Sequence, residues 1–137
     1  MALSGSRQAG LKAINKIVLD ANMLLNAVDF RIDLAEEINA LLQGRKEYFV
    51  PGQVVGELGF LAERKRKLRV NAVLAKKWIE RHAVEIKVAA ENADDALLAL
   101  AEKGFIVASN DRELKKRIKA VNGKMIVLRG KKKLMLY

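Results

Sequence analysis

Short apolar runs recur along the chain, and each ends abruptly at a polar residue or a turn. Continuous runs of this kind, without alternation, are typical of strands buried on both faces of a parallel sheet. We expect strands at Lys16–Leu19, Tyr48–Val50, Val84–Val88, Phe105–Ala108 and Met125–Leu128. Lys131–Tyr137 follows Arg129-Gly130 and is expected to return as an edge strand.

The segments between these runs carry apolar residues at helical spacing. We expect helices at residues 21–28, 33–43, 53–68, 71–81, 92–103 and 111–121. Asp33 and Asn92 are suited to cap two of them, and Gly44 and Gly104 to end them. Strands that alternate with helices predict an α/β fold, here a three-layer α/β/α sandwich around a mostly parallel central sheet.

The chain of 137 residues has the length of one compact domain. Because no linker rich in Pro, Gly or Ser divides it, we expect a single domain over residues 1–137. Residues 1–15 form a polar, helical lead-in, and residues 129–137 a basic tail or edge strand. No stretch approaches the roughly 20 apolar residues of a membrane span, and the start lacks an apolar signal segment. We therefore expect a soluble, cytoplasmic protein with no membrane partner.

The amino-acid composition excludes several kinds of catalytic site. The chain has no Cys and no Thr, three Ser and one His, His82. A thiolate nucleophile, a zinc finger and a His-rich zinc site are therefore excluded, and a Ser–His–Asp triad has little material. The Gly-rich phosphate loops of nucleotide-binding enzymes are also absent. Carboxylates and cations remain as the groups able to carry chemistry.

Acidic residues stand where strands end and helices begin. They are Asp20 after the first run, Glu57 in the helix after Pro51, Asp94 and Asp95 after Asn92, and Asp111 after Ser109-Asn110. Each has a purely structural interpretation. Asp20 could cap a helix, Asp94 and Asp95 could complement a helix dipole, and Glu57 could pair with a Lys or Arg.

Two of these acids are less easily explained by structure alone. Val54, Leu58 and Leu61 mark an apolar stripe that puts Glu57 on or beside the buried face of its helix. Asn110 and Glu113 resemble a capping box, which would leave Asp111 free for another task.

Ligands of α/β sheets gather at the carboxyl ends of the strands, so these acids are expected at one edge. Several convergent carboxylates repel one another unless a divalent cation neutralises them. Oxygen donors suit Mg²⁺ or Mn²⁺ better than zinc. Such an ion lowers the pKa of a bound water and stabilises the charge of phosphoryl transfer.

Four segments that contain these acids resemble the PIN-domain ribonucleases, in the order that the family shows. They are Ile17-Val18-Leu19-Asp20-Ala21-Asn22, Val50-Pro51-Gly52-Gln53-Val54-Val55-Gly56-Glu57-Leu58, Ala93-Asp94-Asp95-Ala96-Leu97-Leu98-Ala99-Leu100-Ala101 and Ile106-Val107-Ala108-Ser109-Asn110-Asp111-Arg112-Glu113-Leu114. The resemblance covers nearly the whole chain. It implies a metal-dependent endoribonuclease in which acidic residues hold Mg²⁺ or Mn²⁺ around an attacking water.

The resemblance also implies roles for individual residues. Asp20, Glu57, Asp94 and Asp111 would be the catalytic acids, and Asp20, Asp94 and Asp111 the metal ligands. Asn22 and Ser109 match small polar positions near the metal, with Ser109 where many members carry Thr. Asp94 matches the family's helix pattern better than Asp95, but the doublet leaves that choice open.

The net charge of +10 is concentrated at one end of the chain. Residues 111–137 carry ten Lys or Arg against two acids, a net of +8, so residues 1–110 carry +2. Basic clusters near the acids could steer RNA phosphates to the site, or could be solvated surface. The candidates for RNA binding are Arg64, Lys65, Arg66, Lys67, Arg112, Lys115, Lys116, Lys131, Lys132 and Lys133.

Several alternatives remain open at the level of sequence. Within the ribonuclease hypothesis, the protein is either a ribosomal-RNA-processing nuclease or the toxin of a toxin–antitoxin pair. Its partners would accordingly be a ribosome-assembly protein or an antitoxin, and the resemblance also makes a homodimer an expectation. The alternative from another class is a non-catalytic RNA- or protein-binding module of a larger assembly. A receiver-type signalling domain is a distant third, because only Asp20 lies near the first strand.

Overall fold

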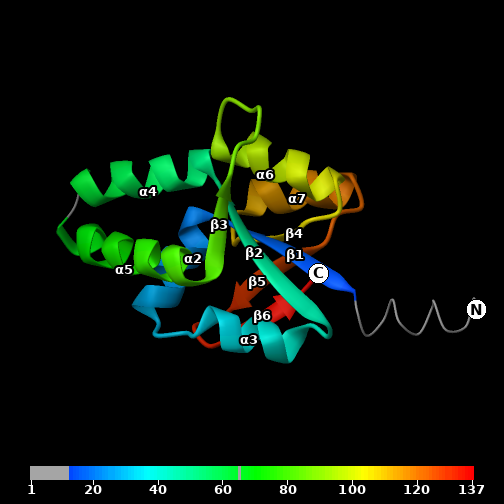
Figure 1. The fold of residues 1–137 in the computed structure, drawn as a ribbon, viewed down its shortest axis with the longest axis horizontal. Coiled ribbons are helices and arrows are strands. Elements are labelled where there is room, and N and C mark those ends of the chain that lie inside the picture. The colour runs from blue at the N-terminus through cyan, green and yellow to red at the C-terminus, as the bar shows by residue number, and fades with distance from the viewer. Residues whose placement is uncertain (1–12, 65) are drawn as a thin grey trace, which may run out of the picture.

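The computed structural model describes residues 13–64 and 66–137, and a six-stranded sheet is its centre (Figure 1). In chain order the strands are β1 (Ile14–Leu19), β2 (Arg45–Pro51), β3 (Ala83–Ile86), β4 (Ile106–Ala108), β5 (Met125–Arg129) and β6 (Lys133–Leu136). Their spatial order is β3-β2-β1-β4-β5-β6. All pairs are parallel except β5 with β6. The predicted antiparallel return at the end of the chain is therefore confirmed over β6.

Helices cover both faces of this sheet. They are α2 (Ala21–Asp29), α3 (Leu34–Leu41), α4 (Gly52–Arg64), α5 (Arg66–His82), α6 (Ala93–Glu102) and α7 (Arg112–Ala120). In Figure 1, α6 and α7 lie together on one side of the sheet and α3 lies on the other, while α4 and α5 form a hairpin that extends past its edge. This arrangement confirms the α/β sandwich with a mostly parallel sheet.

The central strands are buried, as their uninterrupted apolar runs predict. Ile17, Val18 and Leu19 of β1 are each 0% exposed, and β4 is buried along its whole length. Leu19 pairs with Ala108, and the Asp20 N–H donates to the Ala108 carbonyl at 3.0 Å. Because the strands are parallel, this register brings the polar residues after β1 and β4 to the same edge of the sheet.

Residues before the apolar runs make β1 and β2 longer than predicted. β1 begins at Ile14 rather than Lys16, and β2 begins at Arg45 rather than Tyr48. These residues join the ladder through backbone hydrogen bonds, with Ile14 paired to Arg45, although their side chains reach water. Side-chain pattern alone gives no signal for such pairing. β3 also begins and ends earlier than predicted, at Ala83 and Ile86.

The boundary between the two helices of the hairpin was predicted wrongly. α4 ends at Arg64, and α5 begins at Arg66 and contains Asn71, whereas the predicted gap lay at residues 69–70. No Gly or Pro stands in the chain between Gly59 and Arg81, so the sequence holds no residue that marks the break. The predicted helical lead-in falls largely on residues 1–12, and like Lys65 these lie outside the described residues.

Capping residues set several other helix boundaries as predicted. Asp33 accepts from the Glu36 N–H at 3.1 Å and Asn92 from the Asp95 N–H at 2.9 Å, so both act as N-caps. Gly104 follows α6 with φ of +96°, a conformation in which a side chain is strained. None of the helices described is long and apolar enough to span a bilayer.

Candidate functional site

Asp20 lies at the carboxyl end of β1 and is the most buried acid of the site, with 4% exposure. Its Oδ1 accepts from the Ala21 N–H at 2.8 Å, and its Oδ2 accepts from the Ser109 hydroxyl at 2.6 Å. Burial raises the pKa of Asp20. The two hydrogen bonds oppose that rise, and the charges of Asp94 and Asp111 add to it. The carboxylate is thus held in one orientation in a place that disfavours its charge.

The Ser109 hydroxyl connects two of the acids. Ser109 is 0% exposed, donates its proton to Asp20 and accepts from the Asp111 N–H at 3.1 Å. Nearby, the Asn22 side-chain oxygen accepts from the Asn110 N–H at 3.3 Å, which joins the start of α2 to the loop after β4. The structure therefore places Ser109 between Asp20 and Asp111, and Asn22 against the loop that precedes Asp111.

Glu57 stands in the second turn of α4 and is exposed, with Val54 and Leu58 buried on either side of it in sequence. Of the two predicted placements, on or beside the buried face of α4, the structure shows the second, because Glu57 is exposed next to buried Leu58. Desolvation raises the pKa of Glu57, and the charges of Asp20, Asp94 and Asp111 raise it further. In the described part of the chain it has no Lys or Arg ion-pair partner, so the structural interpretation as a buried ion pair does not hold.

Asp94 and Asp95 differ in their surroundings although they are adjacent on α6. Asp95 pairs with Arg117 of α7 at 2.8 Å, so its negative charge is balanced by a guanidinium. It also accepts from the Asn92 side-chain amide at 3.3 Å. Partial burial raises the pKa of Asp94. The charges of Asp111 and Asp95 act in the same direction, and Arg117 opposes them. Asp94 is therefore the acid of the doublet that responds to the other acids of the site.

Asp111 caps α7, accepting from the Leu114 N–H at 3.0 Å. The predicted capping box that starts at Asn110 is wrong. The Asn110 side chain binds β5 instead, donating to the Leu128 carbonyl at 3.0 Å and accepting from the Leu128 N–H at 2.7 Å. Asp111 thus combines a structural cap with a charge that acts on Asp20, Glu57 and Asp94.

Four carboxylates consequently share one edge of the sheet, which gives this edge an excess of negative charge. Oxygen donors in this number match the preferences of Mg²⁺ or Mn²⁺. Burial and the charges of neighbouring acids raise the pKa of Asp20, Glu57 and Asp94, and a cation would offset both effects. Donor chemistry and charge therefore fit such an ion. As they stand, however, no three His, Asp or Glu side chains in residues 13–64 and 66–137 form a group that could hold one.

The predicted RNA-binding cations lie in three separate places. Arg64, Arg66 and Lys67 flank the break of the α4–α5 hairpin, and Arg64 stacks on Phe60 at 4.8 Å. Arg112, Lys115 and Lys116 lie on α7 directly after Asp111. Lys131, Lys132 and Lys133 lie at the turn into β6 and are exposed. Lys65 is outside the described residues.

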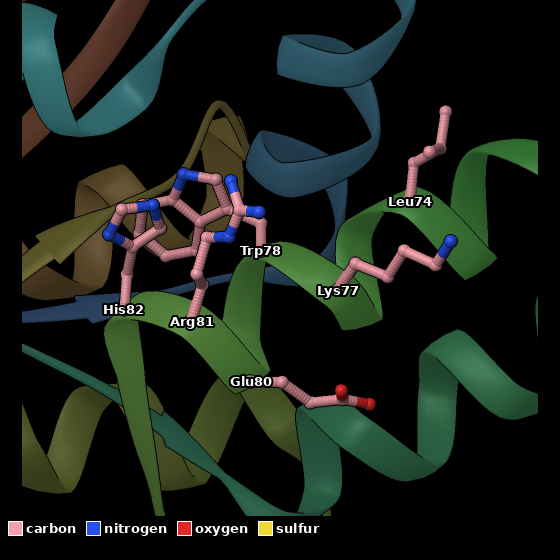
Figure 2. Close-up of a pocket in the computed structure, with 6 residues that line it drawn as sticks. All are labelled: Leu74, Lys77, Trp78, Glu80, Arg81 and His82. Carbon is pink, nitrogen blue, oxygen red and sulfur yellow. The ribbon is translucent and has the colours of Figure 1, made fainter.

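A hollow of about 600 Å³ lies on α5 and is not the acidic edge. Figure 2 shows Trp78, Arg81 and His82 close together there, with Leu74 and Lys77 further along the helix. The Trp78 and His82 rings pack against each other with centroids 4.7 Å apart.

The sequence and the fold of the chain match those of a known family. A family model described as "PIN like domain" matches residues 17–131, which include all four acids. The chain belongs to the PIN-domain family. This PIN domain is 34% identical to Ribonuclease VapC4 of Methanocaldococcus jannaschii over 124 residues, covering 85% of this chain and 92% of the relative. Its fold matches the structure of the PIN domain endonuclease Utp24 with a TM-score of 0.73 and 21% identity, over 88% of this chain and 90% of that one.

Arg117 is the residue near the site of this PIN domain that the sequence did not single out. It stands 22 residues from Asp95 and in a basic run that also fits a solvated helix face, so no spacing predicts the pairing. The contact arises because α6 and α7 pack side by side. It fixes Asp95, whereas Asp94 makes no ion pair in the described part of the chain.

Proposed function

We propose that this PIN domain is a ribonuclease that hydrolyses phosphodiester bonds of RNA at the carboxyl edge of its sheet. The observation that carries the proposal is the gathering of acids at this edge, where the buried Ser109 hydroxyl donates to Asp20 at 2.6 Å and accepts from the Asp111 N–H at 3.1 Å. Desolvation, together with the charges of Asp20, Asp94 and Asp111, raises the pKa of Glu57. A cluster of acids without cations among them destabilises the fold. Carboxylates with a raised pKa are typical of functional sites.

Asp20, Asp94 and Asp111 are the proposed ligands of a divalent ion, Mg²⁺ or Mn²⁺. When bound, such an ion supplies an acidified water and neutralises the charge that develops on the phosphorane. Asp20 is oriented for this task by the Ser109 and Ala21 donors, and each of its oxygens keeps a lone pair. Glu57 has no such hydrogen bond among the described residues, and we propose it as the catalytic acid outside the ligand set.

The named relative supports the same activity. At 34% identity over most of both chains, a protein called a ribonuclease is a direct guide to reaction class. The match to an endonuclease at 21% identity supports the fold. The name of the 34% identical relative and the net charge of +10 support RNA as the substrate.

The proposal is tested by cleavage of a structured RNA with Mg²⁺ or Mn²⁺, before and after chelation, with the wild type and Asp20→Asn and Asp94→Asn. We expect cleavage that stops with chelator, returns with added metal and is lost in both variants. Activity that survives chelation, or survives both substitutions, overturns the assignment. Binding of varied RNAs without cleavage would instead favour the non-catalytic module.

Two biological roles share this chemistry, namely ribosomal-RNA processing and action as a toxin held by an antitoxin. The run from Asp111 to Ile118 resembles the processing nucleases more closely, and we propose that role first. An antitoxin gene beside this one, together with growth arrest on expression that the antitoxin relieves, would favour the toxin. Accumulation of uncut ribosomal-RNA precursor on deletion would favour processing.

A further inference from the structure

Another hollow, of about 220 Å³, is lined by residues of α7, of β5 and of the end of the β5–β6 hairpin. Its lining includes Asn110 and Arg112, the two neighbours of Asp111, together with Lys115, Arg129 and Tyr137. It therefore begins one residue away from a proposed metal ligand. Val127 and Leu128 of β5 complete it.

Positive charge dominates this hollow. Arg112, Lys115 and Arg129 line it, and none of them makes an ion pair with an acid in the described part of the chain. The neighbouring cations of α7 differ, because Lys116 pairs with Glu113 at 3.6 Å and Arg117 with Asp95 at 2.8 Å. Arg129 donates to Met135 Sδ at 3.4 Å, a neutral acceptor that leaves its charge in place. Like charges that line one hollow repel one another, and a bound anion relieves that repulsion.

Tyr137 holds one of these cations in place. The Lys115 ammonium lies 3.6 Å from the centre of the Tyr137 ring, well within the range of a cation–π interaction. The backbone of Tyr137 is held beside β5 because it pairs with Met125, through hydrogen bonds of 2.7 and 3.1 Å. Side chains alternate along a strand, so Tyr137 lies on the same face of the sheet as Val127 and Arg129.

We propose that this hollow binds a backbone phosphate of the RNA strand, one that flanks the bond to be cut. Arg112, Lys115 and Arg129 would contact the phosphate oxygens, and Tyr137 is a positioning residue that acts through Lys115. The inference rests on the proposed function and adds a fixed point of contact beside the acids. A phosphate held here sets which phosphodiester reaches the acids, because neighbouring phosphates of one strand are joined by a single nucleotide.

The hollow suits a phosphate better than a base or an apolar peptide. The Lys115 and Lys119 ammonium groups already lie 3.6 and 5.4 Å from the centre of the Tyr137 ring, where a base would stack. The charged side chains of the lining are all donors, and the Asn110 side chain is committed to Leu128 on both its oxygen and its nitrogen. Guanidinium and ammonium groups are the usual partners of phosphate oxygens.

The test measures RNA binding rather than cleavage, with chelator present and in the Asp20→Asn background. A single-stranded RNA is prepared as a series in which one phosphate at a time is a neutral methylphosphonate. We expect one position at which this replacement weakens binding about tenfold, as loss of a charge-assisted hydrogen bond does. With the methylphosphonate at that position, Arg129→Ala should cause no further loss of RNA affinity. At every other position, the loss of affinity from Arg129→Ala and the loss from the methylphosphonate should multiply.

Three further variants provide the controls. Tyr137→Leu should weaken binding at the same position, and Tyr137→Phe, which keeps the ring, should bind as the wild type does. Lys103→Ala removes one charge at the end of α6, away from the hollow, and should show no coupling to any phosphate. Arg129→Ala should also reduce the slope of log K against log salt by about 0.7 for each phosphate that the protein no longer neutralises.

Coupling of Arg129 to one phosphate, with rescue by Tyr137→Phe, supports the proposal even if the protein cleaves no RNA. Losses that multiply at every position overturn it, even if cleavage is confirmed. Equal binding of Tyr137→Leu and Tyr137→Phe overturns the positioning role of Tyr137. Absence of RNA binding by the wild type overturns the hollow and the RNA-based function together.

Discussion

The Ser109 hydroxyl has two partners that lose their hydrogen bonds when it is removed. In Ser109→Ala, Asp20 Oδ2 loses its donor and the Asp111 N–H loses its acceptor. We expect a fall in the free energy of unfolding of about 1–3 kcal/mol, the usual effect of leaving a buried polar group unsatisfied. Thermal unfolding measures it. Ser109→Thr keeps the hydroxyl and should retain cleavage that Ser109→Ala loses, and equal behaviour of the two variants would contradict the role of the hydroxyl.

Asp94 and Asp95 provide a matched pair, because they have the same charge and stand in the same helical turn. Asp94→Asn should lower the rate of RNA cleavage by about a hundredfold or more, since a metal site contributes several kcal/mol to the transition state. Asp95→Asn removes a half-exposed ion pair with Arg117 and should leave the rate within a few-fold. Comparable losses in the two variants would show that the doublet acts as a unit.

The raised pKa of Glu57 predicts how stability depends on pH without metal. A carboxyl with a raised folded pKa binds its proton more readily in the folded state. Its stabilising contribution is therefore full below the unfolded value of about 4.5 and is lost as pH rises through the folded value. Glu57→Gln should consequently unfold at a higher temperature than the wild type at pH 7, with the difference shrinking toward pH 4.

The matched control for that measurement is Glu102→Gln, which removes an exposed acid from the last turn of α6. It should not reproduce the pH-dependent gain. Added Mg²⁺ should raise the unfolding temperature of the wild type more than that of Glu57→Gln, because the cation relieves the same repulsion. A wild type that is more stable than Glu57→Gln at pH 7 in chelator would contradict the account of the acidic edge.

At the scale of elements, the first turn of α7 depends on Asp111 as its cap. Two substitutions separate this capping role from the role of the negative charge of Asp111. Asp111→Asn keeps a side-chain acceptor for the Leu114 N–H and should fold with near wild-type stability while losing cleavage. Asp111→Ala removes the cap as well and should cost about 1 kcal/mol of stability. Urea unfolding beside a cleavage assay distinguishes the two, and cleavage by Asp111→Asn at the wild-type rate would exclude Asp111 as a ligand.

Elements were predictable where local pattern and tertiary structure agree. The β1 and β4 runs are buried on both faces and were identified from their apolar residues alone. The break between α4 and α5 was not predictable, because no Gly or Pro marks it and both sides are exposed basic helix. Asn110 was misassigned for a related reason, since its partner Leu128 lies 18 residues away in sequence and is adjacent only across the sheet.

At the scale of the whole molecule, the parallel sheet converts separate sequence signals into one site. Asp20 and Asp111 are 91 positions apart in the chain, and the register of β1 with β4 is what joins them through Ser109. The family resemblance alone points to the four acids. The pairing of Asp95 with Arg117 depends on the packing of α6 against α7, which the sequence does not reveal.

Acidic and basic residues occupy neighbouring parts of the molecule. Four acids lie at the carboxyl edge, and the cations of α7 and the β5–β6 hairpin begin directly beside them at Arg112. An acidic centre alone would repel RNA, whereas flanking cations hold the strand and leave the centre to a metal ion. The central claim is therefore that the acidic edge is a metal centre.

Titration of Mn²⁺ into the metal-free protein, followed by calorimetry, tests that claim most directly. The account predicts saturable binding by the wild type and by the control Glu102→Gln, and loss of binding in Asp20→Asn with the fold intact by circular dichroism. Binding of Mn²⁺ by Asp20→Asn with the affinity of the wild type would contradict it.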